Sequence, residues 1–267
     1  MSSVPDVLFV PDGDLFLPTE HTRGPWDPGA QHGGAPASLM ARCIEQVDSP
    51  LPMELARITV ELMRPVPVEQ PLRVQTRLLR PGKKVQLVEA LLTLRDGTEL
   101  SRAVALRIRS RDSADVPAEG TVAVEMPPPP EQGERESPFA GGYGFGTTAV
   151  ELSFVRGHFL ERGPATVWIR LCMPVVPGEQ PSGAQRACAA ADFGNGVSAA
   201  WDWGTTLFIN PDLTVHLGRT PVGEWICLEA VTHPGGNGRA LAESRLFDAV
   251  GVVGRSLQSL LVEPLQP

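Results

Sequence analysis

Cysteine is scarce in this 267-residue sequence, and the four that occur stand far apart, at Cys43, Cys172, Cys188 and Cys227. They form neither a CxxC pair nor a cysteine–histidine pattern with the spacing of metal ligands, so no metal and no other cofactor is expected. Isolated thiols of this kind fit a reducing compartment, and we expect a cytoplasmic protein.

Long apolar runs are also absent. No stretch of about 18 consecutive apolar residues occurs, which is roughly the length that a helix needs to cross a membrane. Residues 1–14 lack the basic segment followed by an apolar stretch that marks a secretory signal. We therefore expect neither a membrane span nor a secreted protein.

Positive charge is in deficit, with 23 lysines and arginines against 31 acidic residues and a net charge of −8. Nucleic acids and anionic membranes are bound by clustered basic side chains, so neither partner is expected. One local cluster, Arg80, Lys83 and Lys84, could still hold an anionic small molecule, although the same residues also fit a solvated hairpin.

Proline, in contrast, is abundant, with 27 residues. This share is about twice the usual ~5%, and it favours strands, turns and linkers because proline interrupts helices. The chain is long enough for two domains of roughly 100–150 residues each.

The sequence contains an internal repeat. Residues 58–64 read ITVELMR and residues 213–219 read LTVHLGR, and each is followed by a strand, a Pro-Gly turn and two more strands. An offset of 155 residues pairs Thr59 with Thr214, and an offset of 154 pairs Glu89 with Glu243. We interpret this near-constant offset as a duplication, with one large undivided sheet as the alternative.

Each half has a helix candidate before its strands. Residues 32–46 place apolar side chains at positions 39, 40, 43 and 44, which form one face of a helix. Residues 182–192 are rich in alanine, begin with the N-cap residue Ser182 and stop before a turn at residues 193–196. Strands such as residues 72–79 alternate between apolar and polar residues, as on a half-buried antiparallel sheet.

These patterns predict an α+β fold in which an antiparallel sheet wraps around one helix, twice in one chain. We expect an N-terminal domain over residues 1–115 and a C-terminal domain over residues 146–267. Residues 116–145, rich in proline, glutamate and glycine, are expected to link them. Sheets of this kind leave exposed edges, so a homo-oligomer is expected.

Polar residues that occur in only one half are candidates for function. By the repeat offset, Asn210 takes the place of Leu55, and Gln258 takes the place of Val104. Asp192 ends the second helix. A carboxylate can accept a proton from water while amides orient that water, so these three side chains form a candidate catalytic set. Each also has a structural interpretation, as a helix-end, turn or strand residue.

The first half offers Gly33 and Gly34 at the start of its helix. Backbone N–H groups are free at such a position, and glycine lets a substrate oxygen approach them closely. A flexible entry to the helix is the alternative. The neighbouring His32 is interpreted as a capping or packing residue rather than as a base.

Four motifs together resemble the acyl-CoA thioesterase II type of double-hotdog proteins, in particular its actinobacterial branch. They are HGGAPA at residues 32–37, ADFGNG at 191–196, NPDLTVHL at 210–217 and LQSLLV at 257–262. The resemblance implies hydrolysis of acyl-CoA to a free acid and CoA, by water that an Asp, a Thr and a Gln orient. The Asp corresponds to Asp192 and the Gln to Gln258. The Thr position falls on Asn210, two residues before Asp212, so the sequence departs from the family there.

On this hypothesis Gly33 and Gly34 hold the thioester oxygen, and Lys83 and Lys84 contact the CoA phosphates. No Gly-x-Ser-x-Gly motif is present, so no covalent intermediate is expected. Two alternatives remain. One is enoyl-CoA hydration, because Asp27 and His32 have the Asp-x4-His spacing of hotdog hydratases without their Asn-Pro. The other is an acyl-CoA-binding protein without catalysis, which the change from Thr to Asn favours.

Overall fold

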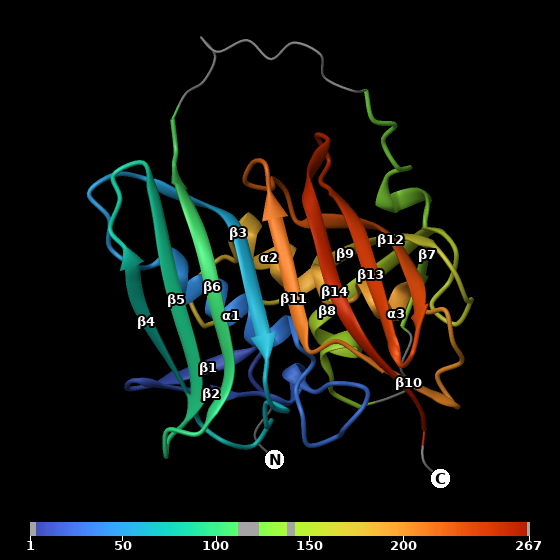
Figure 1. The fold of residues 1–267 in the computed structure, drawn as a ribbon, viewed down its shortest axis with the longest axis horizontal. Coiled ribbons are helices and arrows are strands. Elements are labelled where there is room, and N and C mark those ends of the chain that lie inside the picture. Colours follow the sequence, from blue (N-terminus) through green and yellow to red (C-terminus); the bar gives the residue numbers. More distant parts are fainter. Residues whose placement is uncertain (1–3, 112–122, 138–141, 266–267) are drawn as a thin grey trace.

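The computed structural model describes residues 4–111, 123–137 and 142–265 (Figure 1). In the first half the elements are β1 (Phe9–Asp12), β2 (Leu15–Pro18), η1 (Glu20–Thr22), α1 (Gly34–Glu45), β3 (Met53–Leu62), β4 (Leu72–Arg80), β5 (Val85–Leu94) and β6 (Glu99–Arg109). Those that follow are η2 (Pro130–Gln132), β7 (Glu134–Glu136), η3 (Phe145–Ala149), β8 (Val150–Arg156), β9 (Ala165–Leu171), α2 (Gly183–Ala191), α3 (Gly194–Val197), β10 (Thr206–Ile209), β11 (Asp212–Leu217), β12 (Trp225–Gly236), β13 (Arg239–Phe247) and β14 (Val252–Pro264).

The described strands form one antiparallel sheet in the order β1-β2-β4-β5-β6-β3-β11-β14-β13-β12-β9-β8-β7, with β10 paired to β14. Both α1 and α2 lie behind this sheet in Figure 1, on the face where the main apolar core is buried. The order reads outward in the same way from the central β3–β11 pair, with β6, β5 and β4 on one side and β14, β13 and β12 on the other. The predicted α+β fold is confirmed, and its two helix-wrapped halves join edge to edge through β3 and β11 into one continuous sheet.

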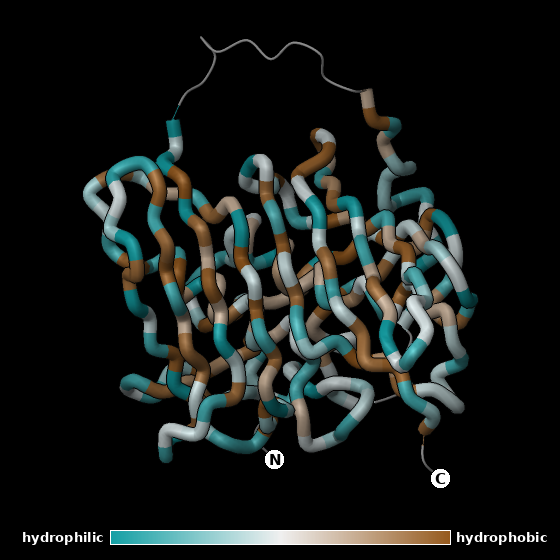
Figure 2. The backbone as a smooth tube through the Cα atoms, in the orientation of Figure 1, coloured by the Kyte–Doolittle hydropathy of each residue, from teal (hydrophilic) through white to brown (hydrophobic). Residues whose placement is uncertain are grey.

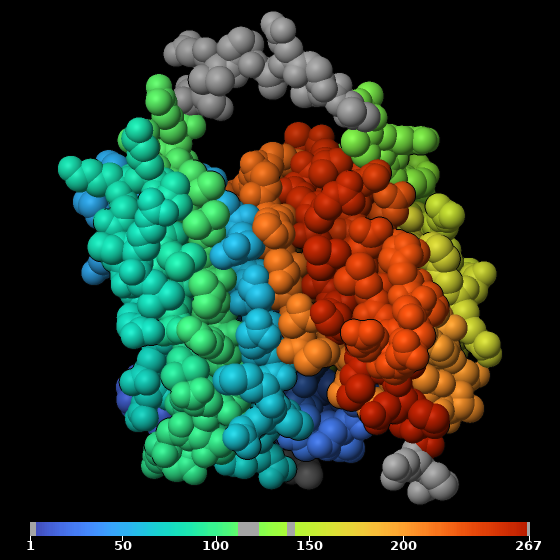
Figure 3. All heavy atoms as spheres, viewed as in Figure 1, coloured from blue at the N-terminus to red at the C-terminus, as the bar shows by residue number. Residues whose placement is uncertain are grey.

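The two halves join at residues that the repeat had already paired. Thr214 of β11 lies opposite Thr59 of β3, and their hydroxyl oxygens are 3.1 Å apart. On either side, Asp212 pairs with Glu61 and His216 with Arg57, as a pseudo-twofold axis through the threonine pair requires. Figure 3 shows the two strands side by side across the middle of the sheet.

The strand register corrects one detail of the repeat. Glu89 pairs with Val104, whereas the equivalent Glu243 pairs with Leu257. Val104 therefore corresponds to Leu257, and the structural counterpart of Gln258 is Ala105. The predicted partner was one residue off, which matters because a one-residue shift moves a side chain to the other face of the sheet. Figure 2 shows this alternation of polar and apolar residues along the strands.

The helix ends agree closely with the sequence. The Ser182 hydroxyl accepts a hydrogen bond from the Gln185 N–H at 3.1 Å, which confirms Ser182 as the N-cap of α2, and Asp192 is its C-cap. The turn expected over residues 193–196 is limited to Asp192 and Phe193, because Gly194 to Val197 form the short helix α3. No helix in the described part of the chain combines the length and apolarity needed to cross a membrane.

Part of the segment expected to link the halves lies against the second half. Residues 123–137 include β7, which pairs with β8, and the Trp168 indole donates a hydrogen bond to the Pro128 carbonyl at 2.7 Å. Residues 116–122 and 138–141 of that predicted linker lie outside the described residues.

A buried ion pair lends itself to a stability prediction. Burial alone would raise the pKa of Asp248, but hydrogen bonds from Arg219 and from the N–H groups of Val222, Val250 and Gly251 lower it to about 2. A pKa below the unfolded-state value stabilises the fold above that value, and the contribution disappears as the pH falls toward 2.

We therefore expect Asp248→Asn to lower the free energy of unfolding by about 2–4 kcal/mol at pH 7, because Arg219 loses its partner. Urea unfolding of the wild type and the variant should show this gap, and the gap should narrow as the pH falls below the usual aspartate range. A gap that does not change between pH 7 and pH 3 would contradict the assignment.

Candidate active site

A cavity of about 420 Å³ lies between the two halves. The N-terminus of α1 and the chain after β3 border it from the first half, and the C-terminus of α2, α3 and the β10–β11 segment border it from the second. Its polar lining residues include His32, Asp192, Asn195 and Asn210.

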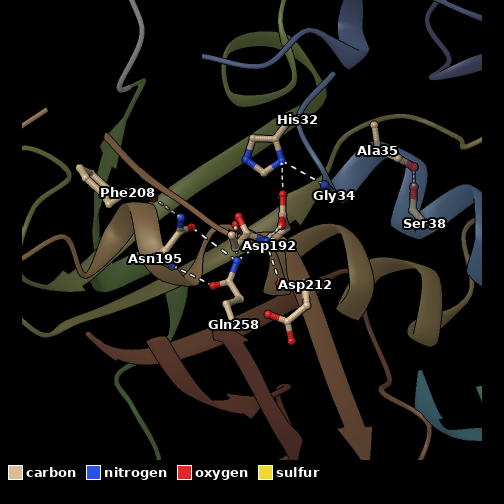
Figure 4. Close-up of polar contacts among 10 residues, drawn as sticks. His32, Gly34, Ala35, Ser38, Asp192, Asn195, Phe208, Asp212 and Gln258 are labelled. Atoms are coloured by element: carbon tan, nitrogen blue, oxygen red, sulfur yellow. Dashed lines mark hydrogen bonds and ion pairs between the residues drawn. The ribbon is translucent and has the colours of Figure 1, made fainter. Parts of the chain in front are cut away.

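The Asp192 carboxylate stands at the centre of this polar group (Figure 4). Its Oδ1 accepts a hydrogen bond from Asn210 Nδ2 at 2.9 Å, and its Oδ2 lies 2.9 Å from His32 Nδ1. Asp192 is only 5% exposed and sits at the negative end of α2, where a carboxylate is disfavoured unless donors surround it. The two side chains from distant parts of the sequence supply those donors.

His32 packs against two neighbouring aromatic rings. Its ring centroid lies 4.9 Å from that of Phe145 and 4.4 Å from that of Phe193. The Nδ1 atom is close to both Asp192 and the Gly34 N–H, the latter at 3.1 Å, and it cannot donate to one and accept from the other in a single tautomer. We assign the proton to Nδ1, because donation to a carboxylate is the stronger interaction. Sequence reasoning missed this pairing of His32 with Asp192.

Gln258 lies behind the carboxylate and is 1% exposed. Its Oε1 accepts the Asn195 N–H at 3.0 Å, and its Nε2 is 3.3 Å from the Asp192 carbonyl and 3.5 Å from Asp192 Oδ1. The cavity lining within the described residues includes Asn195 but not Gln258. The structure thus brings Asp192, Asn210 and Gln258 together. Gln258 lies behind the carboxylate, outside the cavity lining, and Asn195 lines the cavity in addition.

A side chain at either candidate oxygen-binding position would crowd its neighbours. A Cβ on Gly33 would lie 2.8 Å from Asp192 Oδ2, and one on Gly34 would lie 2.6 Å from the Ala189 carbonyl of α2. Gly33 lines the cavity, and no acceptor for its N–H occurs within the described residues. The start of α1 therefore presents an N–H group to the cavity beside the carboxylate.

The basic residues expected to contact phosphate lie elsewhere. Lys83 and Lys84 are exposed in the β4–β5 turn. The next residue, Val85, pairs with Ile108, and Ile108 pairs with Glu54 near the start of β3. The two lysines therefore lie at the end of the sheet where β3 begins. The cavity lies at the opposite end of β3. Arg64 borders the cavity instead, and its exposed guanidinium forms no ion pair with a described residue.

Asp27 and His32 do not form the pair expected of a hydratase. Asp27 is exposed, and its Oδ1 accepts the Gly29 N–H at 2.8 Å. The His32 Nδ1 faces Asp192.

Comparison with known proteins places both halves in one family. The profile of the acyl-CoA thioesterase N-terminal domain matches residues 22–108, and that of the acyl-CoA thioesterase C-terminal domain matches residues 120–262. A search of curated proteins finds no match to this chain.

Several solved structures share the fold at low sequence identity. A conserved protein of unknown function with a hot dog fold from Alicyclobacillus acidocaldarius is 16% identical, with a TM-score of 0.73 over 98% of this chain and 97% of that one. The tesB protein of Mycobacterium avium subs paratuberculosis is 14% identical, with a TM-score of 0.69 over 94% and 93%. An acyl-CoA thioesterase II of Mycobacterium marinum is 16% identical, with a TM-score of 0.64 over 90% and 93%. The predicted double hotdog is confirmed.

Proposed function

The chain belongs to the acyl-CoA thioesterase family, and we propose that it hydrolyses an acyl-CoA thioester with a water molecule that Asp192 activates. The observation that carries this proposal is the Asp192 carboxylate at the cavity wall, held by His32 and Asn210 at 2.9 Å each. A carboxylate fixed in this way is placed to accept a proton from water.

In the proposed reaction, Asp192 takes a proton from the water while the water oxygen forms a bond to the thioester carbonyl carbon. The carbonyl oxygen gains negative charge, which the Gly33 N–H at the start of α1 stabilises. The carbon–sulfur bond then breaks, and the CoA thiolate takes the proton from Asp192. The products are a free acid and CoA.

Asn210 occupies the position where the resemblance calls for a threonine. Its Nδ2 donates both to Asp192 Oδ1 at 2.9 Å and to the Asp212 carbonyl at 3.1 Å, so the amide plane is fixed between them. An amide can orient the carboxylate as a hydroxyl would. This geometry favours catalysis over acyl-CoA binding alone.

The CoA phosphates require a cation near the entrance, and Arg64 is the candidate. It lines the cavity, is exposed, and has no carboxylate partner within the described residues. An arginine so placed can form charge-assisted hydrogen bonds to phosphate. We assign this contact to Arg64 in place of Lys83 and Lys84.

The experiment that tests the function follows the free thiol released from an acyl-CoA series with a thiol reagent. Thiol release is expected from the wild type. Loss of crotonyl-CoA absorbance without thiol release would instead favour hydration. Saturable acyl-CoA binding without either reaction would favour a protein that only binds its ligand.

Gln258 is proposed to position the site rather than to contact the substrate. We expect Gln258→Leu to lower kcat about 10-fold to 100-fold with little change in KM, because Asn195 and Asp192 lose a common brace. The variant also leaves the Asn195 N–H unpaired, at a cost of about 1–3 kcal/mol in the free energy of unfolding.

Gln258→Glu separates the two effects. It keeps an acceptor for the Asn195 N–H but brings a second carboxylate to the position 3.5 Å from Asp192 Oδ1. We expect it to shift the pH–rate profile as well as kcat, because two neighbouring carboxylates titrate together. A kcat that stays at the wild-type value in both folded variants would contradict the positioning role.

We also propose a cytoplasmic homo-oligomer. All four cysteines are free thiols, as in a reducing compartment. On the sheet face away from the helices, Leu241, Leu257 and Leu261 are each about two-fifths exposed. Leu241 pairs with Ser259, which lies between the two other leucines along β14, so the three are diagonal neighbours and favour cover by a second copy. The molar mass in solution, measured by light scattering, tests the oligomer.

A further inference from the structure

One wall of the cavity is a packed set of aromatic rings. Trp203 stacks on Trp26 with ring centroids 4.7 Å apart, and it stacks on Phe159 with centroids 5.3 Å apart. Phe208, which is fully buried, meets Trp203 edge to face at 4.7 Å and Trp26 at 5.1 Å. Trp26, Phe159 and Trp203 line the cavity, and Phe208 packs behind them. We call these four residues the aromatic wall.

The aromatic wall is rigid compared with an aliphatic one. Trp203 contacts each of the other three rings, so it cannot swing aside without breaking three ring contacts. Such pairs contribute about 0.5–1.5 kcal/mol each beyond the area they bury. A long aliphatic chain would therefore be stopped at this wall.

The wall also lies close to the candidate catalytic group. A Cβ built on Gly196 would be 3.4 Å from Trp203 and 3.9 Å from Phe159. Gly196 follows Asn195. The Gln258 side chain accepts a hydrogen bond from the Asn195 N–H and donates one to the Asp192 carbonyl, so it links Asn195 to Asp192. Little room therefore separates the reacting carbonyl from the wall.

Charge and burial give the direction in which a substrate enters. The exposed lining residues include Arg64 and Met63, whereas Trp26 and Trp203 of the aromatic wall are half-buried and Phe159 is 3% exposed. A cavity of about 420 Å³ is near the lower end of the usual range for small-molecule sites, roughly 300–1,000 Å³. This arrangement favours a substrate whose CoA nucleotide stays outside near Arg64 and whose acyl group enters toward Phe159 and the wall.

From these observations we propose that the substrate carries a compact apolar acyl group, a short chain or a single ring, whose size the aromatic wall limits. This inference rests on the proposed function of the same cavity. Trp203 and Gly196 are then specificity-determining residues: Trp203 sets the depth of the acyl site, and Gly196 leaves the space beside it.

The test compares kcat/KM for acetyl-, butyryl-, hexanoyl-, decanoyl-, palmitoyl- and benzoyl-CoA. For the wild type, kcat/KM is expected to be at least about 10-fold higher for benzoyl-CoA, or for acyl-CoAs of hexanoyl size or smaller, than for palmitoyl-CoA. This ratio corresponds to about 1.4 kcal/mol in activation free energy. Trp203→Leu is expected to move the optimum to longer chains. Gly196→Ala, which adds a methyl at ordinary contact distance, is expected to move it to shorter ones. Trp225→Leu, on the outer side of β12, is the matched control and should keep the wild-type profile.

A wild-type optimum at palmitoyl-CoA would overturn the proposal, as would a Trp203→Leu variant that loses activity equally on every substrate while remaining folded. Dissociation constants of the same acyl-CoAs for Asp192→Asn provide a second measurement that does not need turnover. The same order of preference in binding supports the aromatic wall even if the wild type hydrolyses none of them. That result would reject the proposed function alone.

Discussion

Asp192→Asn is expected to reduce kcat/KM for the best acyl-CoA by about 10³-fold, within the 10²–10⁴-fold range of general-base catalysis and equal to about 4 kcal/mol. Asparagine has the same shape and can still meet Asn210, but its amide cannot take a proton from water. KM should change little, because the carboxylate is proposed to act on water rather than to bind the acyl group. Initial rates of thiol release give both constants.

Asp27→Asn is the matched control. Asp27 also borders the cavity, but its side chain is exposed and only caps the Gly29 N–H, which an asparagine oxygen can still do. We expect this variant to retain thiol release within about 3-fold of the wild type, because the exposed side chain keeps its contact with Gly29. Its free energy of unfolding should change by less than about 0.5 kcal/mol, as for other surface changes. Hydrolysis that persists in Asp192→Asn, or that disappears in Asp27→Asn, would remove Asp192 from its proposed role.

Much of the fold could be predicted because the evidence for it is periodic and internal to the chain. The pairing of Thr59 with Thr214 needed only a constant offset, and the structure places the two residues directly opposite each other. Ser182 and Asp192 bound a helix by local hydrogen-bonding chemistry that the sequence displays. The error at Gln258 has an equally local cause. The repeat offset changes by a residue between β5 and β6, and the strand register needed to detect this is not present in a single sequence.

The candidate site could be predicted only in part because its contacts join distant residues. Asp192, Asn210 and Gln258 all belong to the second half, so a comparison between halves could single them out. His32 and Asp192 are 160 residues apart and meet only because the start of α1 packs on the end of α2. No local pattern distinguishes such a histidine from a capping residue. Lys83 and Lys84 illustrate the reverse case. The sequence shows their charge, but it does not show at which end of the sheet they lie.

Gly33→Ala is expected to lower kcat about 10²-fold while the protein remains folded, because a displacement of about 1 Å at a reacting group costs that much. Gly33 has φ −59° and ψ −23°, which alanine adopts freely, so the backbone opposes nothing. The added methyl instead crowds the candidate active site. The new methyl would lie 2.8 Å and 3.0 Å from the two Asp192 oxygens and 3.0 Å from Leu62, and it would stand beside the N–H proposed for the thioester oxygen.

Gly218→Ala provides the comparison, since the nearest atom to its new methyl is the Val253 carbonyl oxygen at 3.8 Å. Gly218→Ala should unfold in urea within about 1 kcal/mol of the wild type, as expected for a glycine-to-alanine change at a compatible site. Gly33→Ala should stay folded but lose about 1–3 kcal/mol, because its methyl displaces the Asp192 and Leu62 side chains. Only Gly33→Ala should lose kcat. If Gly33→Ala fails to fold, Gly33 is needed for packing of α1 against α2. If it keeps full kcat, the start of α1 does not take part in the reaction, and the carboxylate at Asp192 must act without it.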